Sequence, residues 1–125
     1  MFSYQLYSSR NFPPMSRVFE MVSKAGYTAV EGYGALYADD AAVAATRAGL
    51  AATGLTMPTG HFGLEQLETE VDKVLGIARA LKMERLYCPY VAAEDRPEDA
   101  AGWQAFGARL QKAGAPYKAA GYGFG

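Results

Sequence analysis

Two ionisable residues, Glu31 and His61, each follow a short apolar run and lie beside a glycine. The runs at residues 26–30 and 55–60 are typical of strands, so each ionisable side chain is expected at the carboxyl end of a strand. Ligands of parallel α/β proteins bind at those ends. We therefore predict that Glu31 and His61 lie at the same end of one parallel sheet and share a pocket.

His61 is the only histidine in the chain. An imidazole at this place could hydrogen-bond a substrate hydroxyl or act as an acid or base, and the alternative is a loop histidine satisfied by backbone or by Glu31. Glu31 could orient a ligand hydroxyl, or it could form an ion pair or cap a helix. A metal site centred on His61 is not expected, because no second histidine and no Cys–His spacing accompanies it.

The rest of the chain predicts alternating strands and helices. Strands are expected at residues 3–8, 27–31, 55–59, 85–91 and 122–125. Helices are expected between them, at residues 13–25, 40–53, 65–82 and from 95 onward, because apolar residues recur there three and four positions apart. The strand starts are about 24 to 30 residues apart, which is the spacing of βα units in a parallel sheet.

Several residues set the expected helix ends. Gly26 and Gly54 should follow the first two helices, and Asp39 or Asp40 should cap the second. The last helix is predicted to begin with a capping box at residues 95–98 and to break or kink at Pro116. Its buried face is expected to consist of Trp103, Phe106, Leu110 and Ala113.

Three motifs occur in order along the chain: Gly26-Tyr27-x-x-Val30-Glu31, Gly60-His61-Phe62 and Tyr87-Cys88-Pro89-Tyr90. Together with the closing run at residues 120–125, they resemble the xylose-isomerase-like TIM barrels, a superfamily with many sugar and sugar-phosphate isomerases and epimerases. The resemblance implies an α/β fold of parallel βα units, the N-terminal half of a (β/α)8 barrel. This half would hold about four βα units and the start of a fifth strand, in a single partial domain over residues 1–125.

The same resemblance implies a sugar or sugar-phosphate isomerase or epimerase, with metal-assisted proton transfer beside a carbonyl in the full-length enzyme. The ligands of its divalent ion, Mn²⁺ or Mg²⁺, would lie on strands of the second half, so no metal ligand or catalytic residue is assigned here. The 125-residue chain alone is expected to be inactive. Glu31, His61, Tyr7 and Tyr90 would bind the sugar, although for Tyr7, Tyr33 and Tyr90 plain packing is the alternative.

Composition argues against several classes of partner. The chain has 12 basic and 13 acidic residues, a net charge of −1, and no Lys/Arg cluster. Nucleic acid, anionic membranes and DNA-repair endonuclease chemistry are therefore not expected. The single cysteine, Cys88, cannot form an internal disulfide and suits a reducing, cytoplasmic compartment. The glycine-rich segments do not form GxGxxG between a strand and a helix, so no dinucleotide site is expected.

A second hypothesis is a non-catalytic α/β half-barrel that binds a small ligand or associates with itself as a homo-oligomer. An open parallel sheet has two edges with unpaired backbone groups. Four apolar residues would be covered by the other half in a full barrel, and we expect several of them to be partly exposed here: Leu6, Val30, Met57 and Leu86.

Overall fold

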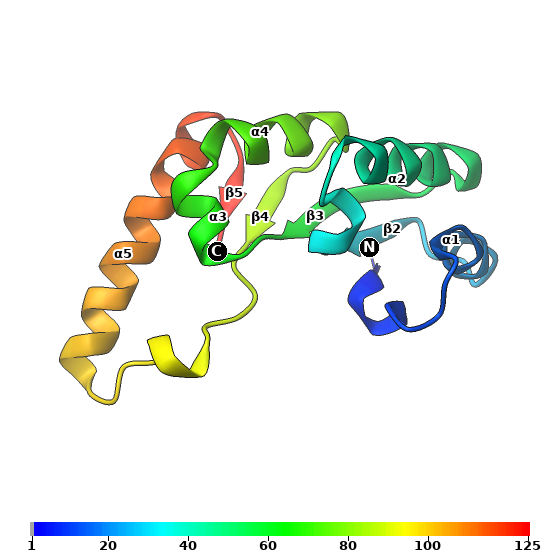
Figure 1. Cartoon of the computed structure of the whole chain (residues 1–125). Helices are drawn as coiled ribbons and strands as arrows, with labels where there is room; N and C mark the ends of the chain where they lie inside the picture. The colour runs from blue at the N-terminus through cyan, green and yellow to red at the C-terminus, as the bar shows by residue number, and fades with distance from the viewer. Residues whose placement is uncertain (1) are drawn as a thin grey trace.

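The strands form one parallel sheet in the order β1-β2-β3-β4-β5, so consecutive strands lie side by side (Figure 1). The computed structural model describes residues 2–125. The strands are β1 Ser3–Gln5, β2 Ala29–Gly32, β3 Thr56–His61, β4 Arg85–Tyr87 and β5 Gly123–Phe124. The helices are α1 Met15–Lys24, α2 Asp40–Thr53, α3 Leu64–Thr69, α4 Val71–Ala80 and α5 Ala100–Ala119, with short 3-10 turns at η1 Leu6–Ser9, η2 Gly34–Tyr37 and η3 Ala93–Asp95.

The helices cover one face of the sheet. In Figure 1, α2 and α4 lie above the strands, α3 lies to their left beside α5, and the outer half of α5 extends away from the sheet. The core lies between the sheet and these helices, where Val30, Met57 and Leu86 are at most 1% exposed. The opposite face carries polar side chains, because Gln5, Glu31, Thr59 and Arg85 follow one another in register across four strands.

An extra residue in β3 sets the direction of its side chains. Ala29 pairs with Thr56 but Glu31 pairs with Thr59, so β3 advances three residues while β2 advances two. Such bulges change the face to which later side chains point. As a result Met57 is buried against the helices, whereas Thr59 and His61 lie on the opposite face, where both contact Glu31.

The four apolar residues expected to be partly exposed are all buried, so that prediction is wrong. Val30, Met57 and Leu86 point toward the helices, and Leu6 is fully buried at the start of η1 rather than within a strand. The residues that a second half-barrel would cover are polar ones on the other face. Exposed apolar strand residues therefore give no reason for self-association.

Several predicted boundaries also differ. The first strand ends at Gln5, and the long helix expected at residues 65–82 is divided at Glu70 into α3 and α4. The fourth strand ends at Tyr87 instead of residue 91. Cys88 still donates a backbone hydrogen bond to Gly125, but Pro89 has no N–H group with which to continue the ladder.

Helix α5 begins later and runs further than predicted. Its cap is Asp99, whose side chain accepts a hydrogen bond from Gly102, and it continues through Pro116 to Ala119. A proline removes one helical hydrogen bond, and the buried side chain of Tyr117 holds the last turn against the core. Of the four residues predicted to be buried only Ala113 is; Trp103 is 47% exposed, and Phe106 and Leu110 are partly exposed.

Other predictions are confirmed. Gly26 and Gly54 follow α1 and α2 with left-handed backbone conformations, and the Asp39 side chain caps α2 by accepting a hydrogen bond from Ala42 at 2.8 Å. The fifth strand forms at Gly123 and pairs with β4. No helix among residues 2–125 is long and apolar enough to cross a membrane.

Candidate functional site

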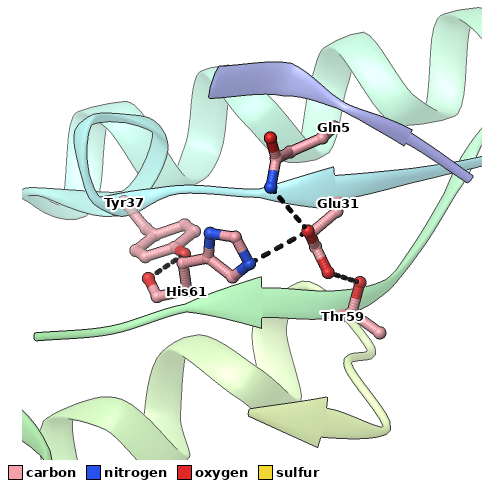
Figure 2. Close-up of polar contacts among 5 residues, drawn as sticks. All are labelled: Gln5, Glu31, Tyr37, Thr59 and His61. Carbon is pink, nitrogen blue, oxygen red and sulfur yellow. Dashed lines mark hydrogen bonds and ion pairs between the residues drawn. The ribbon is translucent and has the colours of Figure 1, made fainter. Parts of the chain in front are cut away.

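Glu31 and His61 are in direct contact at the carboxyl ends of β2 and β3. Parallel pairing of Gly32 with Gly60 brings the two side chains together, and Nε2 of His61 lies 2.9 Å from Oε1 of Glu31 (Figure 2). The side chain of His61 is 16% exposed and that of Glu31 is 19% exposed. The prediction that both lie at one end of the sheet, close enough to share a pocket, is confirmed.

Two more side chains fix the carboxylate of Glu31. The amide Nε2 of Gln5 donates to Oε1 at 3.2 Å, and the hydroxyl of Thr59 donates to Oε2 at 2.8 Å (Figure 2). Counting His61, the carboxylate therefore has three partners, which come from the strands on either side of its own, β1 and β3. A carboxylate held in this way has little rotational freedom, so it orients the imidazole instead of following it.

The contact with Glu31 also determines which ring nitrogen of His61 can meet a ligand. Nε2 is occupied by Glu31. Within the part of the chain that the structure describes, every buried side-chain nitrogen or oxygen has a hydrogen-bond partner. Nδ1 of His61 has no such partner there, so this atom is accessible to solvent. A neutral imidazole that donates through Nε2 presents Nδ1 as an acceptor. This atom is the polar group that His61 can offer to a ligand.

His61 lines a cleft of about 500 Å³ with aromatic walls. The tyrosines proposed from the sequence as ligand-binding residues, Tyr7 and Tyr90, both lie on it and are 48% and 63% exposed. Tyr7 packs edge-on against Tyr33 with ring centroids 5.5 Å apart. The structure thus brings all four predicted residues together, Glu31 through its contact with His61 and the other three on the cleft surface.

Cationic side chains lie over both exposed tyrosines. The guanidinium of Arg10 is 4.1 Å from the centroid of the Tyr7 ring, and that of Arg96 is 5.3 Å from Tyr90. Each contact covers one ring face and restricts its side chain. The aromatic walls of the cleft are therefore partly held in place.

The residues of this chain do not fit a divalent metal site. Among residues 2–125, no group of three or more His, Cys, Asp or Glu side chains lies close enough to hold an ion. Glu31 and His61 could offer two ligands, but they bind each other, and Gln5 and Thr59 also donate hydrogen bonds to the carboxylate oxygens. Mn²⁺ and Mg²⁺ require more oxygen ligands than this arrangement supplies.

Another cleft, of about 490 Å³, lies between α3 and α5 and has a different character. Its charged residues, Glu68 and Arg109, form a bidentate pair with two N–O distances of 2.7 Å. This hydrogen bonding lowers the pKa of Glu68. Because the pair satisfies itself, this contact holds two helices together and does not offer a free group to a ligand.

Sequence reasoning missed Gln5, Thr59 and Tyr37 as parts of the site. The first two are polar residues within apolar strands, which is the signal that could have identified them. Their contact with Glu31 depends on strand register, which includes the bulge in β3. Tyr37, whose hydroxyl bonds the backbone of His61, has no comparable sequence signal.

No family model matches the sequence, and no curated protein matches it. Three solved structures are similar in fold. A sugar phosphate isomerase/epimerase from Parabacteroides distasonis ATCC 8503 has a TM-score of 0.78 and 19% identity, over 98% of this chain and 49% of that one. An AP endonuclease, family 2, from Brucella melitensis has a TM-score of 0.73 and 18% identity, over 98% of this chain and 53% of that one.

The third similar structure is a D-psicose 3-epimerase in the presence of D-fructose, with a TM-score of 0.65 and 16% identity, over 98% of this chain and 51% of that one. The chain thus spans about half the length of each protein it matches. At these identities the similarity is one of fold. Five consecutive parallel strands with alternating helices agree with it. The chain has the α/β fold of one half of a TIM barrel, as its sequence predicted.

Proposed function

We propose that this chain is part of a sugar or sugar-phosphate isomerase or epimerase, and that its cleft binds the sugar. The observation that carries the proposal is the Glu31–His61 pair, held at the strand ends and facing an aromatic cleft. Two of the similar structures support it, because one is a sugar phosphate isomerase/epimerase and another is a D-psicose 3-epimerase with D-fructose.

The cleft offers the contacts that a sugar requires. Nδ1 of His61 would accept a hydrogen bond from a sugar hydroxyl, while Glu31 keeps the imidazole in place. The rings of Tyr7 and Tyr90 would pack against the apolar C–H surface of the sugar, and their hydroxyls would remain at the rim. One hydrogen bond and two ring contacts correspond to a weak complex, with a Kd of about 1 mM or about −4 kcal/mol.

The reaction we propose for the whole protein is metal-assisted proton transfer beside a carbonyl. The residues of this chain do not fit the metal, so we assign them substrate binding alone. We propose that the catalytic groups and the ligands for Mn²⁺ or Mg²⁺ belong to the polypeptide that completes the barrel. The 125-residue chain is then a sugar-binding half without turnover of its own.

The proposed partners follow from charge and fold. A net charge of −1 argues against nucleic acid and anionic membranes as ligands, although one similar structure is an AP endonuclease. The single cysteine favours a cytoplasmic location. The proposed sugar substrate would give the protein a role in carbohydrate metabolism there. An oligonucleotide with an abasic site is therefore the appropriate negative ligand.

The alternative is a non-catalytic half-barrel module that associates with itself. The observation that favours it is the sheet face opposite the helices, where Arg85 is exposed and takes part in none of the salt bridges among residues 2–125. Light scattering at several concentrations tests this alternative. A mass that rises to twice 13.4 kDa would support the module, whereas a constant mass of 13.4 kDa would contradict self-association.

The test of the proposed function is a ligand titration followed by NMR of the single histidine. D-fructose and D-fructose 6-phosphate are added to the 125-residue chain, and a duplex with an abasic site serves as the third ligand. We expect a sugar to shift the His61 imidazole signal with a Kd of about 1 mM. Tyr90→Ala should weaken this binding, while Tyr27→Ala is the matched control, because Tyr27 is a partly exposed tyrosine that does not line the cleft.

Either of two results would overturn the proposal. If neither sugar shifts the His61 signal at saturating concentration, the cleft is not a sugar site. If the abasic duplex binds and the sugars do not, nuclease-type recognition replaces it. Equal weakening by Tyr90→Ala and Tyr27→Ala would show that the binding takes place outside the cleft.

A further inference from the structure

One buried side chain contacts both the backbone carbonyl of His61 and the ring of the next residue, Phe62. Tyr37, the last residue of η2, is 1% exposed. Its hydroxyl donates to the carbonyl oxygen of His61 at 2.5 Å (Figure 2). Its ring stacks on Phe62 with centroids 4.9 Å apart. The backbone that carries the imidazole is therefore held from the helix side of the sheet, while Glu31 holds the imidazole from the other side.

Two glycines leave room for the Tyr37 ring. Gly32 and Gly60 are paired in register on β2 and β3. A Cβ atom at Gly32 would lie 3.0 Å from Cε1 of Tyr37 and 2.6 Å from the sulfur of Met57. A Cβ atom at Gly60 would lie 3.3 Å from the Tyr37 hydroxyl and 2.7 Å from a methyl group of Met83. The glycine after Glu31 and the glycine before His61 thus both make room for this tyrosine and for a methionine, Met57 at the first and Met83 at the second.

The backbone of Tyr37 is itself fixed from α2. The hydroxyl of Thr46 donates to the carbonyl of Leu36 at 2.8 Å, and both residues are buried. Burial raises the pKa of Tyr37 far above its ordinary value, and the Glu31 carboxylate adds to the increase. The hydroxyl therefore keeps its proton and remains a donor at neutral pH.

We propose that Tyr37 is a positioning residue for His61, which fixes the backbone so that Nε2 meets Glu31 and Nδ1 faces the cleft. The buried ring could have packed equally well as phenylalanine. What the hydroxyl adds is a hydrogen bond to the one carbonyl that belongs to the imidazole-bearing residue. The expected effect on sugar affinity rests on the proposed function of the cleft. The positioning of His61 itself can be tested without a ligand.

The chain contains a matched control for the loss of this hydroxyl. Tyr117 is also fully buried, and its hydroxyl donates to a backbone carbonyl, that of Leu67, at 2.8 Å. Tyr37→Phe and Tyr117→Phe therefore remove the same group from the same kind of hydrogen bond. Only the first hydrogen bond ends on His61.

The experiment compares the two variants by thermal unfolding and by NMR of the single imidazole, without ligand. We expect both to lose similar stability, corresponding to a roughly 2- to 12-fold smaller equilibrium constant for folding. The His61 imidazole signal should move or broaden in Tyr37→Phe and stay in place in Tyr117→Phe. In a sugar titration, Tyr37→Phe should weaken binding about tenfold, a loss that Tyr117→Phe does not share.

A second pair of variants tests the same geometry with the hydroxyl retained. Gly60→Ala places a methyl group against the side chain of Met83 and 3.3 Å from the Tyr37 hydroxyl, whereas Gly76→Ala adds one on α4 where nothing lies within 4 Å. The His61 signal should move in the first and not in the second. An unchanged His61 signal in both Tyr37→Phe and Gly60→Ala would refute the positioning role, whether or not the cleft binds a sugar.

Discussion

Replacement of Glu31 by alanine should destabilise the fold by about 2 kcal/mol, which is large for a residue at the end of a strand. The carboxylate accepts hydrogen bonds from Gln5 and Thr59 and contacts His61 at 2.9 Å. Three such contacts have a net value of about 1 kcal/mol each, or about 3 kcal/mol in all. The carboxylate is 19% exposed, so water can satisfy part of the freed donors, and we reduce the total accordingly.

In thermal unfolding followed by far-UV circular dichroism, this loss corresponds to a decrease in Tm of about 8 °C for a chain of this length. Glu20→Ala is the control, because Glu20 is exposed on α1 and should change stability by less than about 0.5 kcal/mol. Glu31→Gln should fall between the two, since its amide group must direct N–H toward one of the existing donors.

A double-mutant cycle isolates the contact with His61. Glu31→Ala, His61→Ala and the double variant should give a coupling free energy of about 1 kcal/mol, as is usual for side chains in direct contact. If Glu31→Ala unfolds within about 2 °C of the parent, the carboxylate does not organise the three strands, and the description of the site as preorganised is wrong.

Three further predictions follow from other parts of the fold. Arg109→Ala should lower Tm at neutral pH, and in a series of thermal melts this effect should disappear as the pH falls below about 4. Arg109 lowers the pKa of Glu68, so the pair stabilises the fold only while Glu68 is ionised. If the Tm difference between the parent and Arg109→Ala persisted unchanged at pH 2–3, this explanation would be wrong. Lys82→Gly should stabilise the fold by about 1 kcal/mol in urea denaturation, because Lys82 has a left-handed backbone with a φ of 55°. Lys24→Gly in α1 should destabilise the fold, and an equal loss of stability in both variants would rule out strain at Lys82. Calorimetric titration with Mn²⁺ should show no stoichiometric site, and sub-micromolar binding would refute the conclusion that Glu31 and His61 do not fit a metal.

The sequence was sufficient to predict the parallel sheet, the pairing of Glu31 with His61 and the general place of Tyr7 and Tyr90. These features depend on local patterns: an apolar run, a glycine and an ionisable residue recur at the spacing of βα units. The helix ends at Gly26 and Gly54 are equally local. The resemblance to a barrel family added to this prediction that the chain is half of a barrel, with about four βα units and the start of a fifth strand.

The face of each strand that carries the helices could not be predicted from local patterns. Val30, Met57 and Leu86 were assigned to the side left open, but they pack under the helices. The extra residue in β3 reverses the alternation between Met57 and His61, so a simple period of two fails there. The break at Glu70 and the continuation of α5 through Pro116 depend on tertiary contacts, which override local helix signals.

The position of Trp103 has a practical consequence for any spectroscopic study of this chain. It is the only tryptophan in the sequence, it is 47% exposed on the outer half of α5, and its ring meets that of Phe106 edge-on at a centroid distance of 5.9 Å. Its fluorescence therefore reports the outer end of α5 and not the core beneath α2 and α4. Because helix ends open more readily than the core, an emission change on heating would mark local fraying at a lower temperature than the loss of ellipticity. The difference between the two temperatures would measure how independently that end of the helix opens.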